Sequence, residues 1–129
     1  MTAPSTIKLI DNKAAQTNPD KYTTITVDTA AVLESWRQSV FSFEWLTEDS
    51  KIKSFEELSA EEADKRRAVE DALQKNEELE KPVLGIGMLD NVEIGTGRAV
   101  LLTLIDKGVK MIEVHIPKSN ESDFKDFLA

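Results

Sequence analysis

The fold of this chain is decided by residues 83–116, which read VLGIGMLDNVEIGTGRAVLLTLIDKGVKMIEVHI. Residues 83–88 are apolar except for two glycines, a composition that predicts a buried strand with a close neighbour on its backbone. Residues 109–116 place Ile112, Val114 and Ile116 on one side and polar groups on the other. This alternation predicts a second strand with one buried face.

The residues between these strands are read as a turn over 89–97 and then as one of two structures over 98–107. As a helix, residues 98–107 collect their polar side chains on one arc, opposite the apolar ones, and Gly108 follows as a left-handed terminator. The alternative is a hairpin that turns at residues 106–108. We expect the helix, because a strand here would present apolar groups on both sides. Residues 83–116 then form a β-α-β unit with parallel strands.

The N-terminal half predicts a strand and a helix in succession. Residues 22–27 alternate β-branched side chains, which is typical of a strand. Asp28 follows as a helix cap, and apolar residues at helical spacing predict a helix over 29–41. The end of this helix is ambiguous, because the aromatic residues of 41–45 also alternate as a strand would.

The remaining helices are predicted from their caps. Residues 59–62 read SAEE, a capping box that opens a surface helix, and Pro82 ends it. Arg66 and Arg67 in this helix are expected to pair with acidic neighbours three or four residues away. Asn120 is the expected cap of a short terminal helix. Its apolar residues that cover an edge of the core are Phe124, Phe127 and Leu128.

Together these elements predict a small single-domain α/β or α+β fold, a mixed sheet with helices packed on it. The length of 129 residues suits a single core. Residues 1–21 are polar with one short apolar patch, so we expect an N-terminal tail with the capacity for a short edge strand. Residues 22–129 are expected to form the globular domain.

Charge and composition argue against several classes of partner. The chain has 24 acidic and 16 basic residues, and most of the excess lies in residues 44–81, with 13 acidic against 7 basic. Nucleic acids and anionic membrane surfaces are bound mainly through basic clusters, so neither is expected. No apolar run approaches the roughly 20 residues of a membrane span. Without cysteine or a recognisable secretory signal, a cytoplasmic location is expected.

The most suggestive candidate site is the glycine-rich loop within residues 85–98, which ends in Gly95-Thr96-Gly97-Arg98. Amides at a helix start carry partial positive charge, so a phosphate or carboxylate could sit at Gly97 with Arg98 as its counter-ion. The glycine spacing matches neither the dinucleotide fingerprint nor the phosphate-binding loop. Glycines that only permit tight turns explain the same pattern, and this interpretation is favoured.

His115 is the only histidine, so imidazole chemistry would have to use it. A carboxylate at Glu113, on the same strand face, would raise its basicity. Asp90 and Glu93 are candidates for the second half of an acid/base pair. The favoured alternative is a histidine that is hydrogen-bonded to backbone or solvent. No serine elbow of the Gly-x-Ser-x-Gly form and no cysteine support nucleophilic catalysis.

No metal and no cofactor are expected. The side chains of Asp90, Asn91 and Glu93 could offer oxygens to a hard cation, but the spacing of a calcium loop is missing. Cysteine ligands are excluded by composition.

An aromatic group is dense for a chain with only 6% aromatic residues, and it comprises Trp36, Phe41, Phe43 and Trp45. Core packing is the default for such rings. If they are exposed, they mark a protein interface, where Trp and Phe carry much of the binding energy. Self-association is the simplest form of such an interface.

These observations predict a small non-catalytic binding or protein-interaction module that associates with itself through the aromatic group or a sheet edge. The alternative is a site for a small anionic ligand, or an acid/base enzyme site, at the glycine-rich loop. This alternative depends on a helix over 98–107, because open sheets place ligands at the carboxyl ends of their parallel strands.

Overall fold

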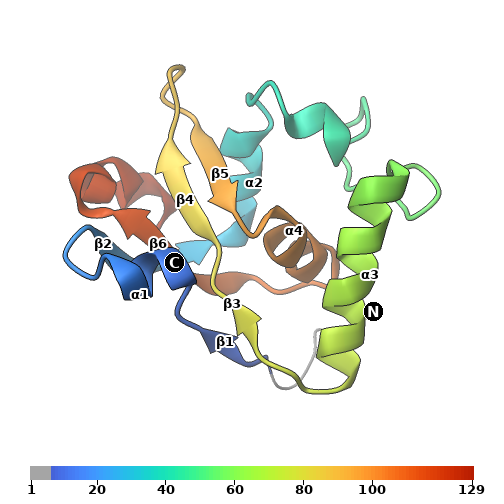
Figure 1. Ribbon diagram of the computed structural model, residues 1–129. Coiled ribbons are helices and arrows are strands. Elements are labelled where there is room, and N and C mark those ends of the chain that lie inside the picture. Colours follow the sequence, from blue (N-terminus) through green and yellow to red (C-terminus); the bar gives the residue numbers. More distant parts are fainter. Residues whose placement is uncertain (1–6) are drawn as a thin grey trace.

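The computed structural model describes residues 7–129, and a four-stranded sheet runs through its centre (Figure 1). Its strands, in spatial order, are β2 (Tyr22–Asp28), β6 (Met111–Pro117), β4 (Val83–Ile86) and β5 (Val92–Thr96). The outer pairs are antiparallel, and the central pair β4 and β6 is parallel, with Val83 opposite His115. The fold is therefore a small α+β domain with a mixed sheet, as predicted.

The predicted β-α-β unit is confirmed. Helix α4 (Arg98–Asp106) joins the β4–β5 hairpin to β6, so the hairpin alternative for residues 98–107 is wrong. Gly108 has φ +91° and ends the helix in the left-handed conformation, as its sequence position indicates. The helix is favoured over a strand because it buries its apolar side chains, and Leu101, Leu102 and Leu104 are all in the core.

Strand β5 lies where a turn was expected. The tight turn is confined to residues 87–91, where the Asp90 N–H donates to the Gly87 carbonyl at 3.1 Å and Asp90 has φ +59°. Beyond it, Val92 and Ile94 point to the core side of the sheet. The turn residues on both sides of this short strand masked its alternation.

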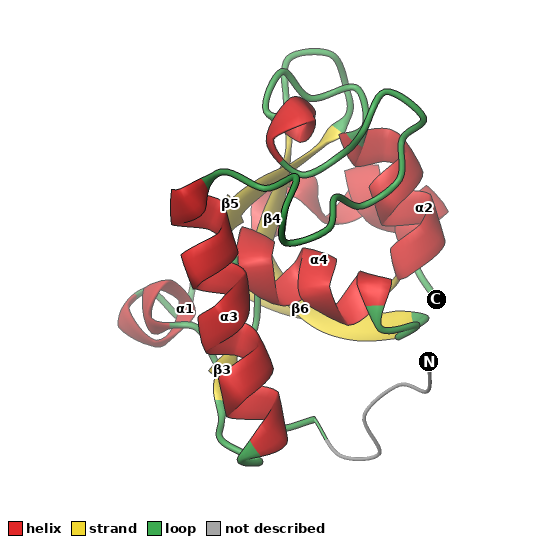
Figure 2. Ribbon diagram, turned by 90° about the vertical axis from the view of Figure 1, so that its right-hand side faces the viewer, coloured by secondary structure: helices red, strands yellow, loops and turns green. Residues whose placement is uncertain are grey.

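One face of the sheet carries the main core. It packs against α2 (Thr29–Trp36), α4 and the 3₁₀ helix η2 (Lys118–Phe127). Figure 2 shows α4 and the longer α3 in front of the strands. The buried cluster comprises Val27, Val32, Leu84, Val92, Leu101, Leu104, Ile112, Val114, Ile116 and Phe124. Among residues 7–129, no helix is both long enough and apolar enough to cross a membrane.

Helix α2 ends at Trp36, five residues earlier than predicted from its apolar spacing. Serine side chains supply the reason. The Ser39 Oγ accepts the Phe41 N–H at 3.2 Å, and the Ser42 Oγ donates to the Arg37 carbonyl at 3.0 Å. These bonds replace helical ones and turn the chain into the short 3₁₀ helix η1 (Ser42–Glu44).

Helix α3 (Ala60–Gln74) begins at the predicted cap, where the Ser59 Oγ accepts the Glu62 N–H at 3.2 Å. It ends before Pro82, because Asn76 adopts φ +55° and the chain continues into β3 (Leu79–Glu80). The predicted arginine pairs form. Arg66 lies 3.3 Å from Glu70 and Arg67 lies 2.8 Å from Asp64. Arg66 also reaches across to α4, 2.6 Å from Asp106.

From Ile7 onward, the segment expected to be a tail is part of the fold. Strand β1 (Leu9–Ile10) pairs in parallel with β3 in a separate two-stranded sheet, and α1 (Lys13–Thr17) follows. Residues 1–6 of the predicted tail lie outside the described residues. At the other terminus, η2 buries Phe124 as expected, but its cap is Pro117 and not Asn120.

Candidate functional site

The glycine-rich loop and the start of α4 line a pocket of about 470 Å³. All four predicted ligand-binding residues contribute to it, namely Gly95, Thr96, Gly97 and Arg98. The facing side is made by the start of α3 and by Glu44 of η1. The volume falls within the roughly 300–1,000 Å³ that is usual for small-ligand sites.

The backbone at Gly97 positions the start of α4. Gly97 has φ +81°, and a Cβ at this position would lie 2.9 Å from the Cα of Pro82. Glycine is therefore required both by conformation and by space. The first helical bond runs from the Leu101 N–H to the Gly97 carbonyl at 3.0 Å, and no side chain caps the helix. The three preceding amides, which belong to pocket-lining residues 98–100, carry the positive end of the helix dipole.

Arg98 is the basic residue that the loop presents to the pocket. Its Nη1 donates to Glu44 Oε1 at 2.9 Å and lies 3.8 Å from Glu62 Oε1. The guanidinium also lies near two rings, with Cζ 5.9 Å from the Trp36 centroid and 5.7 Å from the Phe41 centroid. These contacts restrain the Arg98 side chain.

Glu62 is a buried carboxylate in the pocket wall. Its Oε1 accepts the Trp45 indole N–H at 2.7 Å, and its Oε2 lies 3.2 Å from the Lys65 ammonium. Burial opposes its ionisation, but the bonds from Trp45 and Lys65 outweigh that effect and hold the pKa of Glu62 below its usual range. The bond between Lys65 and Glu62 also raises the pKa of Lys65. Glu62 is thus ionised and already neutralised by its own neighbours.

The charges of the pocket lining nearly balance. Glu44, Glu61 and Glu62 contribute three negative charges, and Lys65 and Arg98 contribute two positive ones, for a sum of −1. A ligand here would be held by directed donors, the α4 amides and the guanidinium, and not by net positive charge. Comparison with protein-family models, with curated proteins and with solved structures finds no match to this chain.

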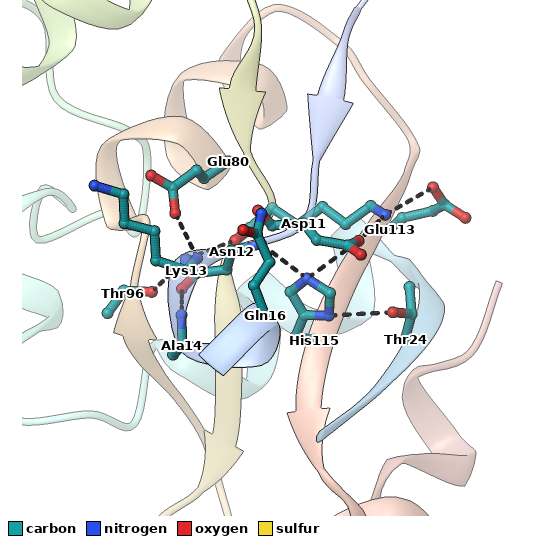
Figure 3. Close-up of polar contacts among 11 residues, drawn as sticks. Asp11, Asn12, Lys13, Ala14, Gln16, Thr24, Glu80, Thr96, Glu113 and His115 are labelled. Carbon is teal, nitrogen blue, oxygen red and sulfur yellow. Dashed lines mark hydrogen bonds and ion pairs between the residues drawn. The ribbon is translucent and has the colours of Figure 1, made fainter. Parts of the chain in front are cut away.

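His115 lies on the opposite face of the sheet, in a polar cluster of its own (Figure 3). Its side chain is buried and makes two hydrogen bonds, from the Asn12 N–H to Nε2 and between Nδ1 and the Thr24 Oγ1, both 3.1 Å long. Burial is the largest effect and lowers the pKa of His115, and the nearby Lys81 adds to this. Glu113 raises the pKa as expected, and so does Asp11, but burial and Lys81 outweigh both carboxylates. The alternative of a hydrogen-bonded histidine is confirmed.

The predicted acid/base partners of His115 are not brought to it. Asp90 is exposed at the tip of the β4–β5 hairpin. Glu93 lies two strands away, about 10 Å at the usual strand spacing. Its carboxylate accepts from Ser39 at 2.6 Å and from Asn91 at 3.0 Å. Among residues 7–129, no three carboxylate or imidazole groups gather as metal ligands would.

The aromatic group divides into buried and exposed members. Trp36 and Trp45 belong to a second core cluster with Leu102, so their assignment to an interface is wrong. Trp36 is the last residue of α2 and Trp45 directly follows η1, and both indoles are buried. Phe41 and Phe43 are 51% and 67% exposed, and the neighbouring Val40 is 72% exposed.

Several residues of these sites escaped the sequence analysis, among them Lys65 and Thr24, and two others connect distant segments. Asn12 caps α1 and joins His115 to Thr96, and Glu44 accepts the hydrogen bond of Arg98. The cap itself has a local signal, since Asn12 precedes a run of helix-forming residues. The contacts between Asn12 and Thr96 and between Glu44 and Arg98 have none, because their partners are far apart in the chain.

Proposed function

We propose that this protein is a non-catalytic cytoplasmic binding protein whose pocket between α3 and α4 takes a small ligand through a phosphate or carboxylate group. The observation that carries this proposal is that the uncapped start of α4 and Arg98 together line one pocket of about 470 Å³. Helix amides and arginine are the donors that proteins commonly use for such anions.

The Glu44 carboxylate supports this proposal, because it already accepts a hydrogen bond from the Arg98 guanidinium at 2.9 Å, as the anionic group of a ligand would. It is an internal anion in the place where the ligand's anionic group would bind. Binding therefore exchanges one carboxylate for another anion. Only the Glu44 side chain, which is one-third exposed, has to turn away from Arg98, so η1 and the sheet stay in place.

The separation of the titratable groups supports binding without catalysis. His115 is buried on the other face of the sheet, and its two ring nitrogens are both used in hydrogen bonds. A general base has to reach the proton that it abstracts, within about 3 Å or through one water. The pocket instead contains ionised carboxylates that are paired with Arg98 and Lys65.

The test is a thermal-shift and calorimetric titration with inorganic phosphate, acetate and chloride at constant ionic strength. Phosphate or acetate is expected to stabilise the wild-type protein, and Arg98→Gln is expected to abolish the effect. Arg67→Gln is the matched control, because Arg67 also pairs with one carboxylate but lies exposed on α3. Equal stabilisation of wild type and Arg98→Gln, or none with either anion, would rule the site out.

A second candidate function is self-association through a surface that we call the aromatic ridge, made of Val40, Phe41 and Phe43. Three large apolar side chains that are all more than half exposed within four residues are unusual on a monomer. The segment is also held rigidly, because Trp36 before it and Trp45 after it are buried. A rigid apolar surface loses little entropy on binding.

Sedimentation velocity over a range of protein concentrations tests this second candidate. We expect a dimer that Phe43→Ser dissociates. Phe55→Ser is the control, because Phe55 is a partly exposed phenylalanine elsewhere, packed on Arg66 and Arg67. A wild-type protein that stays monomeric at all concentrations removes self-association and leaves the ligand site unaffected.

A further inference from the structure

Helix α1 and its flanking residues form a strap, residues 11–18, across the face of the sheet that α2 and α4 leave uncovered (Figure 3). Asn12 is one attachment point and is itself buried, and the Lys13 N–H is another, since it donates to the Glu80 Oε1 at 2.9 Å. The Asn12 side chain donates to the Lys81 carbonyl and to the Thr96 Oγ1, each at 3.2 Å. Its Oδ1 accepts the Ala14 N–H at 2.9 Å and caps α1.

The backbone N–H of Asn12 is held by the imidazole of His115, at 3.1 Å from Nε2. A backbone amide can only donate, so Nε2 must offer a lone pair. The ring proton is then on Nδ1, where it is donated to the Thr24 Oγ1 at 3.1 Å. The docked strap thus requires neutral His115 in a single tautomer.

The charged groups around His115 come from three elements. Asp11 of the strap lies with Oδ1 3.7 Å from Nε2, Lys81 precedes β4, and Glu113 lies on β6. Strand β2 contributes the uncharged Thr24. Asp11 is committed to Lys81 at 3.0 Å, and Lys81 lies 3.8 Å from Glu113. The lysine therefore competes with the imidazole for both carboxylates.

We infer that His115 is a proton-sensitive latch, whose protonation releases the strap and with it the support that Asn12 gives to Thr96 in the pocket loop. A protonated Nε2–H would face the Asn12 N–H, and two donors repel at hydrogen-bonding distance. The nearest acceptor for the new proton is Asp11, which can turn to it only by leaving Lys81. This latch is inferred from the contacts of the strap alone, and it does not require that an anion binds in the pocket.

The direction of the pH effect follows from the environment of the ring. Burial lowers the pKa of His115 in the docked state below the ordinary value of 6.5. The released state binds the proton more readily, so docking is complete above pH 6.5 and is lost as the pH falls through the lowered pKa. The opening equilibrium can change by up to about tenfold per pH unit between the two pKa values.

The first experiment measures the ring nitrogens of the single histidine by ¹⁵N NMR between pH 8 and pH 5. At pH 8 we expect Nδ1 protonated and Nε2 unprotonated. In parallel, hydrogen-exchange protection of the amides of residues 12–18 is expected to fall by up to about tenfold per pH unit between pH 6.5 and the lowered pKa of the docked state, after correction for intrinsic rates. Amides of β6 should keep their protection.

His115→Gln is the decisive variant, since a glutamine amide keeps its acceptor oxygen and its donor NH₂ group unchanged at every pH. Its strap should stay docked at pH 5. Glu113→Gln is the matched control, because it removes a neighbouring charge without touching the Asn12 bond, and it should keep the pH response. A proton on Nε2 at pH 8, or a strap protection that is independent of pH in wild type, would overturn the latch. An equal pH response in His115→Gln would do the same. If this variant does not fold, the wild-type nitrogen shifts and exchange profile decide alone.

Discussion

Glu44 Oε1 lies 2.9 Å from Arg98 Nη1, so the basic side chain of the pocket loop is already bound by an acidic side chain 54 residues away in the sequence. The Arg98 side chain is one-quarter exposed and that of Glu44 one-third. The pair is accessible enough to open and buried enough to hold the guanidinium in place. Without a ligand, the charge of Arg98 is therefore neutralised by Glu44.

Glu44→Gln should strengthen phosphate or acetate binding, because the competing carboxylate is gone. A partly exposed ion pair contributes up to about 1 kcal/mol, so affinity should rise by up to about fivefold. Isothermal titration of both proteins with phosphate measures the ratio. Glu48→Gln changes the same charge in the nearby loop without contact to Arg98 and should leave the affinity within error. A weaker affinity in Glu44→Gln would mean that Glu44 binds the ligand and does not compete with it.

Gly97→Ala should destabilise the protein more than Gly108→Ala. Both glycines have positive φ, +81° and +91°, so both substitutions introduce backbone strain of about 1 kcal/mol or more. Only at Gly97 does the added Cβ meet backbone, 2.9 Å from Pro82 Cα, whereas nothing lies within 4 Å at Gly108. We expect losses of about 2–4 and about 1 kcal/mol in urea unfolding. Equal losses would show that strain alone, without the Pro82 contact, determines the cost.

Arg66→Gln should cost about 2–3 kcal/mol of unfolding free energy. The guanidinium is buried between α3 and α4, where it bonds to Glu70 at 3.3 Å and to Asp106 at 2.6 Å. Arg67→Gln, one residue along, should cost less than about 0.5 kcal/mol, because its pair with Asp64 is exposed. Chemical denaturation of the two variants tests the difference. Similar values would mean that the α3–α4 contact does not depend on this pair.

Stability should fall as the pH drops below about 4.5. Burial acts against ionisation of Glu62 and Glu70, but bonds from Trp45 and Lys65 to the first, and from Lys107 and Arg66 to the second, hold both pKa values below 4.5. A carboxyl group with a lowered folded pKa stabilises the fold above its unfolded pKa, and this contribution is lost as the pH falls through the folded one.

Glu62→Gln should make this acid dependence less steep, because one of the two groups no longer titrates. Unfolding free energies measured between pH 6 and pH 3 give the slope. Glu61→Gln is the control, since the Glu61 side chain is 80% exposed one residue away. An unchanged slope in Glu62→Gln would assign the acid sensitivity to other groups.

The elements that could be predicted are those whose signals are local. Strands β4 and β6, helix α4 and its end at Gly108 follow from alternation, helical spacing and one glycine. The cap at Ser59 and the pocket residues 95–98 were found in the same way. The hairpin strand β5 was not predicted, because the turn residues on both sides of it hid its short alternation. The early end of α2 was not predicted either, because serine side chains there formed hydrogen bonds that overrode the apolar pattern.

Residue order within a few positions therefore set the secondary structure of the C-terminal third and placed glycines where a helix had to begin and end. The chemistry of both sites came from contacts between distant segments. Asn12 reaches His115 across 103 residues, and of the four aromatic residues considered for an interface Trp36 and Trp45 are buried in the core. Burial and hydrogen-bond partners are properties of the folded packing, and no spacing along the chain encodes which distant groups will meet. The protonation of His115 and the pairing of Arg98 were thus decided only when the strap and η1 docked on the sheet and its helices.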